Sequence, residues 1–134
     1  MTSPDSDTLT QGIRVVAAAR YASSDSQPSS SQYLYEYHVR ITNAGRERVR
    51  LRSRHWVILD ANNQRAEVRG EGVVGKQPSL APGESFEYDS SCPLRTRWGT
   101  MEGEYTFERD DGSRFQVEIG RFFLVPSRAK VGAR

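Results

Sequence analysis

The run of residues 46–60 carries the pattern that most constrains the fold. Arginine occupies every even position from 46 to 54, and Val49 and Leu51 fall between these arginines. Only an extended strand places residues i and i+2 on one face, because an α-helix repeats every 3.6 residues. The run therefore predicts a β-strand that lines one surface of a sheet with guanidinium groups.

Period-two alternation recurs along most of the chain, and no window shows a sustained helical stripe. Turn-forming residues separate the runs at positions 43–45, 62–63, 81–83 and 110–112. Half-buried antiparallel strands produce this pattern, so we predict an all-β sandwich of two antiparallel sheets with about seven or more strands. The apolar members of the other runs are Ile13, Val15, Ala17, Ala19 and Tyr21; Tyr33, Tyr35, Tyr37, Val39 and Ile41; Phe86 and Tyr88; Met101, Gly103, Tyr105 and Phe107; and Phe115, Val117 and Ile119.

The apolar positions change parity within the arginine-rich run. Before residue 53 they are odd-numbered, whereas from Trp56 onward they include even-numbered ones. One explanation is a β-bulge near residues 53–55, which adds one residue and exchanges the two faces. The other is a central strand that is buried on both faces after Arg54. We favour the bulge, and both explanations end the arginine face at about Arg54.

The length of 134 residues suits one domain. Residues 1–11 and 126–134 lack apolar periodicity, so we expect both ends to be disordered around a sandwich domain of residues 12–125. The serine-rich residues 23–32 predict a flexible loop.

Composition and charge limit the classes of protein to which the chain can belong. No apolar run approaches the roughly 20 residues of a spanning helix, and the start lacks the features of a secretory signal, so we expect a cytoplasmic protein without a membrane span. The net charge is only +2, from 19 basic and 17 acidic residues, which argues against nucleic-acid binding. Cys92 is the only cysteine, which excludes an internal disulfide, and we expect a buried thiol.

Several long motifs resemble the bacterial ApaG family, and the resemblance covers about residues 12–125. It rests on residues 53–56, 60–62, 68–78, 80–88, 99–103 and 122–124. It implies an immunoglobulin-like or fibronectin type III-like β-sandwich and a link to cobalt tolerance and magnesium efflux. Related domains in eukaryotic F-box proteins and in a polymerase-interacting protein look like protein-binding modules. The resemblance therefore implies a non-catalytic module with a protein partner, and it implies no cofactor.

The glycine-rich segment of residues 70–76 matches G-x-G-x-x-G, but no amphipathic helix follows to make a dinucleotide site. It also departs from a P-loop, because Gln77 occupies the Ser/Thr position. A weaker hypothesis is a nest of backbone amides that binds phosphate or pyrophosphate. The candidate residues are Gly70, Gly72, Gly75 and Lys76. The alternative is a structural loop that packs against the sandwich.

The arginine face also has two interpretations. Guanidinium groups on a strand can stay solvated and pair across the sheet, and such pairs contribute only about 0.2–1 kcal/mol each. They can also bind an acidic partner surface or phosphates. The partner-binding candidates are Arg48, Arg50, Arg52 and Arg54.

The chain offers no catalytic constellation and no metal site by spacing. His38 and His55 fall on different predicted strands, and Ser53 with His55 lacks the acid and oxyanion hole of a triad. Glu102 and Glu104 predict a solvated acidic face that can complement the arginines within the sheet or in a dimer. We therefore expect a non-catalytic binding module, monomeric or homodimeric, with a protein partner. The alternative is a sensor that binds phosphate, pyrophosphate or a nucleotide phosphate through the glycine-rich loop of residues 70–76.

Overall fold

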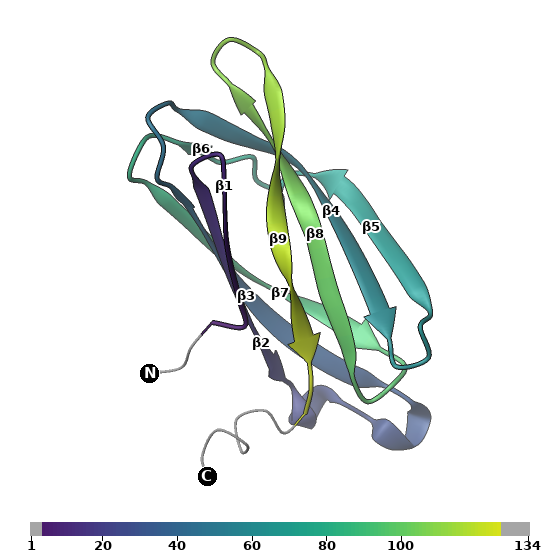
Figure 1. Ribbon diagram of the computed structural model, residues 1–134. Coiled ribbons are helices and arrows are strands. Elements are labelled where there is room, and N and C mark those ends of the chain that lie inside the picture. The colour runs from purple at the N-terminus through teal and green to yellow at the C-terminus, as the bar shows by residue number, and fades with distance from the viewer. Residues whose placement is uncertain (1–3, 127–134) are drawn as a thin grey trace.

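Two antiparallel sheets pack face to face in the computed structural model, which describes residues 4–126 (Figure 1). One sheet has the order β1-β2-β3-β7. The other has the order β5-β4-β8-β9, with β6 pairing to β4. The predicted all-β sandwich, of the immunoglobulin-like and fibronectin type III-like kind, is confirmed. The strands are β1 Ser6–Thr10, β2 Ile13–Tyr21, β3 Tyr33–Asn43, β4 Val49–Asp60, β5 Arg65–Glu71, β6 Ser79–Leu80, β7 Ser85–Leu94, β8 Gly99–Arg109 and β9 Arg114–Leu124.

The core lies between the sheets and is built from the inward members of the alternating runs. Trp56 of β4 occupies its centre, with ring centroids 5.3 Å from Tyr37, 6.4 Å from Tyr105 and 6.0 Å from Phe122. Opposite Trp56 in the β8 register is Gly103, where an added Cβ would lie 2.0 Å from the carbonyl oxygen of His55. Gly103 therefore allows the backbones of β4 and β8 to approach beneath the central tryptophan.

A β-bulge is present in β4, as predicted, but it lies just before the predicted residues 53–55. The register between β4 and β8 shifts between Leu51 and Ser53, so Arg52 is the extra residue. Leu51 before the bulge and Trp56 after it are both buried, although their positions differ in parity. A residue beyond the bulge therefore faces the side opposite to the one that simple alternation predicts.

The predicted disorder of residues 1–11 is wrong for the segment that forms β1. Ser6–Thr10 pairs with β2, although its one large apolar residue, Leu9, is 67% exposed. Polar contacts hold this strand: Arg14 binds Asp7 through two hydrogen bonds, and the Ala19 N–H donates to Asp5. Apolar alternation could not reveal such a strand. Residues 1–3 and 127–134 lie outside the described residues, so the predicted C-terminal disorder is not decided there.

The serine-rich residues 23–32 form a connection that contains two short 3-10 helices, Ser23–Asp25 and Pro28–Ser30. Ser26 organises it, because its hydroxyl donates to the Ala22 carbonyl and accepts from the Leu34 N–H, at 2.8 and 2.9 Å. The predicted loop is therefore present, and its flexibility stays a prediction.

Candidate interaction site

The two lateral sides of the sandwich differ. On one side β1 lies next to β9, and the hydroxyl of Thr8 donates to the Glu118 carbonyl while the Glu118 N–H donates to Thr10. On the other side the edge strands are β7 and β5. Strand β7 contains Pro93, which lacks an N–H and therefore disfavours pairing with an added strand at this edge. Strand β5 contains no proline and is therefore the edge better suited to pair with another chain.

Two backbone hydrogen bonds define the phase of the β4–β5 ladder. The Gly72 N–H donates to the Arg52 carbonyl at 2.9 Å, and the Asp60 N–H donates to the Gln64 carbonyl at 3.1 Å. In an antiparallel pair, hydrogen-bonded and non-hydrogen-bonded positions alternate. The β5 residues that bond to β4 are therefore Ala66, Val68 and Gly70.

The intervening residues of β5 direct their backbone groups away from β4. Arg65, Glu67 and Arg69 point their N–H and C=O groups to the free edge of the sheet, and all three residues are exposed. On the inward-facing side of the same strand, Val68 is 41% exposed. The edge thus offers unpaired backbone groups beside an exposed apolar side chain.

Arg54 does not join the other arginines, because it lies beyond the bulge. Its guanidinium lies over Gly70 and donates to the carbonyls of Glu71 and Gly72, at 3.1 and 2.9 Å. The prediction that Arg54 shares the outward arginine face is wrong, for the parity reason given above. Arg54 instead stabilises the C-terminal end of β5 and the start of the glycine-rich loop.

The glycine-rich loop uses several of its amides internally. Besides the Gly72 N–H, the amides of Val73 and Lys76 donate to each other's carbonyls, at 2.8 and 2.9 Å. Gly72 and Gly75 have φ of 66° and 80°, and the side chain of Val73 is fully buried. These features support the structural interpretation of the loop. Anion binding at Gly70, Gly72, Gly75 and Lys76 stays a prediction.

The remaining candidate arginines lie near the start of β4. Arg48 precedes the strand and donates to the Ser79 hydroxyl at 3.1 Å. Arg52 contacts the Glu108 carboxylate of β8 at 3.6 Å, which is the cross-strand pairing considered for this face. Arg50 lies between them and is exposed. The structure therefore brings Arg48, Arg50 and Arg52 together and separates Arg54 from them.

His55 lies on the outer face of β4, between two carboxylates. Its Nε2 is 2.8 Å from Glu67 of β5, and its Nδ1 is 3.2 Å from Glu104 of β8. The His55 hydrogen bond is the largest cause that lowers the pKa of Glu67. Both ring nitrogens have carboxylate partners, so His55 is not arranged to activate Ser53. Glu104 therefore contacts the strand that carries the arginines, but its partner on that strand is His55.

His38 occupies a similar position on the outer face of the other sheet. Its Nδ1 is 2.9 Å from Asp89 and its Nε2 is 2.7 Å from Glu87, both on β7. The hydrogen bond to Asp89, followed by that to Glu87, raises the pKa of His38 against the opposing effect of burial. The carboxylates lie on opposite sides of the ring. Among residues 4–126 no group of three His, Cys, Asp or Glu side chains is placed to hold a metal ion.

The buried ionisable groups are held neutral by their surroundings. The Cys92 thiol is buried, which raises its pKa to about 11. The hydroxyls of Tyr88 and Tyr105 are 2.5 Å apart, and burial raises the pKa of both tyrosines. A neutral thiol and neutral phenols are poor nucleophiles, so these groups are suited to packing.

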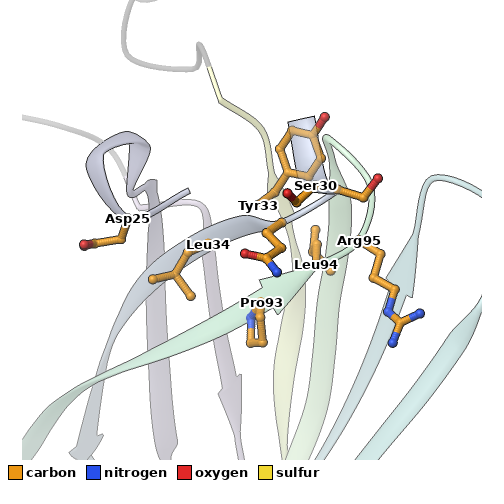
Figure 2. A pocket seen from close by; sticks show the side chains of 9 residues that line it. Asp25, Ser30, Tyr33, Leu34, Pro93, Leu94 and Arg95 are labelled. Carbon is orange, nitrogen blue, oxygen red and sulfur yellow. The ribbon is translucent and has the colours of Figure 1, made fainter. Parts of the chain in front are cut away.

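An open depression of about 630 Å³ lies where the 3-10 segment meets the end of β7. Leu34 and Pro93 face each other across the β3–β7 pair and form part of its floor (Figure 2). Asp25 and Arg95 lie at opposite sides, so their charges do not converge on one point. The depression therefore does not bring its two charged side chains together on one ligand position.

Comparisons with known proteins identify the family of the chain. The sequence profile of the ApaG domain matches residues 23–109. Protein ApaG of Methylobacterium nodulans is 53% identical over 123 residues, which cover 91% of this chain and 95% of that protein. Protein ApaG of Rhodopseudomonas palustris is 48% identical over 122 residues, which cover 91% and 94%.

A crystal structure described as the ApaA protein of Bordetella pertussis superposes with a TM-score of 0.84. It is 48% identical in sequence, and the match covers 87% of this chain and 94% of that one. In the described part of the chain no helix is long and apolar enough to cross a membrane. The long motifs, the two-sheet architecture and these relatives lead to one conclusion: the chain belongs to the ApaG family.

Proposed function

We propose that this protein is a binding module that takes an extended segment of a partner protein as an additional strand on β5. The observation that carries the proposal is the outward direction of the backbone groups of Arg65, Glu67 and Arg69 at an exposed sheet edge. Such an edge forms main-chain hydrogen bonds with an added strand, while alternate side chains provide selectivity.

The chemistry of β5 indicates which segment fits. The outer face of the strand alternates in charge, with Arg65 and Arg69 on either side of Glu67, and both arginines contact Glu67. The inner side presents Val68. A complementary segment therefore carries acidic residues opposite the arginines and an apolar residue beside Val68. If the module contributes to cobalt tolerance and magnesium efflux, it does so through this partner. We also propose that the module is cytoplasmic.

The edge hypothesis can be tested by removing one backbone donor. Arg69→Pro eliminates an N–H that does not bond to β4, so the strand should remain in place, since proline is tolerated at edges. Arg69→Ala is the matched control, because it removes the same side chain and keeps the N–H. Partner capture from a lysate of the source organism is compared for the three proteins, with circular dichroism to verify folding.

The expected result is a specific, stoichiometric partner that binds the wild type and Arg69→Ala but not folded Arg69→Pro. In the complex, the amides of Glu67 and Arg69 should become protected from hydrogen exchange. Equal binding by Arg69→Pro would contradict pairing at this edge. A loss with Arg69→Ala as large as that with Arg69→Pro would instead show recognition by side chains.

A further inference from the structure

A second hollow, of about 250 Å³, lies near the start of β4 on the outer face of its sheet. It is distinct from the β5 edge and from the depression beside Pro93. Arginines at the start of β4 form much of its wall, together with residues of β6 and of the end of β8. The lining residues are Arg48, Val49, Arg50, Arg52, Ser79, Glu108, Arg109 and Asp110.

The positive charges of this hollow exceed the negative ones. Arg48, Arg50 and Arg52 supply three guanidinium groups, against the carboxylates of Glu108 and Asp110. Glu108 lies opposite Arg50 in the register, yet its carboxylate contacts Arg52 at 3.6 Å and Arg114, from outside the hollow, at 3.4 Å. The one carboxylate directly across from Arg50 is therefore already shared by two other arginines.

The other arginines of the hollow have neutral partners. Arg48 donates to the Ser79 hydroxyl. Arg109 pairs with the buried Val49 in the register, so its side chain lies on the inner side of the sheet. Its guanidinium carbon is 4.1 Å from the centre of the Phe115 ring, and its N–H groups donate to Ser113 and Gln11 at 3.3 and 3.0 Å. Arg109 therefore lines the hollow without directing its charge into it. For Arg48, a hydroxyl partner orients the guanidinium group without cancelling its charge.

Arg50 is the least compensated member of the set. Within residues 4–126 it has no ion pair and no side-chain hydrogen bond, although β6 and β8 flank it on both sides. Its neighbours are held in place, while its own donors remain available for a ligand. The hollow thus combines oriented guanidinium groups with an unused one.

We propose that this hollow binds a small, multiply charged phosphoryl anion, of which pyrophosphate is the simplest probe. Guanidinium groups bind phosphoryl oxygens through paired, charge-assisted hydrogen bonds. An excess of positive charge from several arginines favours a multiply charged oxyanion over a single carboxylate. The proposal is independent of partner binding at β5, and it assigns the anion to the arginines at the start of β4 rather than to the glycine-rich loop.

Titration of the ¹⁵N-labelled full chain with pyrophosphate separates the two locations. We expect saturable shifts at the amides of Arg50, Ser79 and Glu108, and none of comparable size at Gly72 and Val73. Binding should weaken with added salt, because the site is exposed. Orthophosphate, with fewer charges, should bind more weakly than pyrophosphate.

Three variants test the assignment. Arg50→Gln should weaken pyrophosphate binding about tenfold or more, the value expected for a lost charge-assisted contact. Arg95→Gln is the matched control, because it removes the same charge from an exposed arginine that lines the other depression. Lys76→Gln tests the glycine-rich loop. Neither of these two should change affinity by more than about twofold.

Two results would overturn the proposal. One is the absence of saturable shifts up to about 10 mM pyrophosphate, since affinity weaker than that does not distinguish a site from a charged surface. The other is saturable binding that Lys76→Gln abolishes and Arg50→Gln leaves intact, which would place the anion in the loop. Arg50 is exposed and without partners, so its variant is expected to fold.

Discussion

Arg50 and Arg54 are both arginines of β4, but they lie on either side of the bulge. Replacing each by alanine should therefore affect the stability of the fold differently. Arg54 is half-buried and donates two hydrogen bonds to carbonyls of the β5 end. Arg50 is exposed and bonds to no described side chain. Arg54→Ala should therefore destabilise the fold, whereas Arg50→Ala should be nearly silent.

The magnitude follows from the two hydrogen bonds of Arg54. A hydrogen bond to a charged group contributes about 1.5–3 kcal/mol, and partial exposure places these two at or below the lower end of that range. We expect Arg54→Ala to lower the free energy of unfolding by about 2–3 kcal/mol, which corresponds to a fall in Tm of about 6–12 °C for a domain of this size. Arg50→Ala should stay within about 0.5 kcal/mol of the wild type.

Urea denaturation of the three proteins measures these differences, provided that the slope of the transition is unchanged. Hydrogen exchange adds a local readout, because the amides of Gly72, Val73 and Lys76 should exchange faster in Arg54→Ala. Arg54→Lys should not restore stability fully, since one ammonium group cannot reproduce the fork of a guanidinium. If Arg54→Ala were as silent as Arg50→Ala, the inward orientation of Arg54 would be refuted.

Two further predictions concern the centre of the sandwich and its pH dependence. Gly103→Ala should lower the free energy of unfolding, measured by urea denaturation, by about 3 kcal/mol or more, because the new Cβ would lie 2.0 Å from the backbone of β4. Gly112→Ala is the control: Gly112 has open space around it and φ of 89°, so the loss should be only about 1 kcal/mol. The raised pKa of His38, caused first by its hydrogen bond to Asp89, stabilises the fold fully below the unfolded value of about 6.5, and this contribution disappears as pH rises through the higher folded value. The wild type should therefore have a slightly larger unfolding free energy at pH 5.5 than at pH 8.0, and His38→Gln should remove this difference. The difference should be at most about 0.5 kcal/mol, because the His38 side chain is 44% exposed. A His38 contribution that is larger at pH 8.0 than at pH 5.5 would contradict the assignment.

The candidate site was only partly predictable from the residues. The arginine-rich run correctly indicated a charged strand face and a parity change, because both are properties of consecutive residues. Ser79 was missed, since its place beside Arg50 depends on the pairing of β6 with β4. Strand β5 was also missed, because an edge strand exposed on both faces has no apolar alternation.

By itself, the sequence determined the buried strands, the turns between them and the change of parity within the arginine-rich run, because burial of one face imposes a period of two. The tertiary structure decided which strands are edges, since that depends on which neighbours a strand acquires in the sheet. It also decided the direction of Arg54. One extra residue at the bulge turns that side chain from the outer arginine face towards the carbonyls of the glycine-rich loop. The order of the residues alone does not state where the register shifts, because that shift is a relation between β4 and β8.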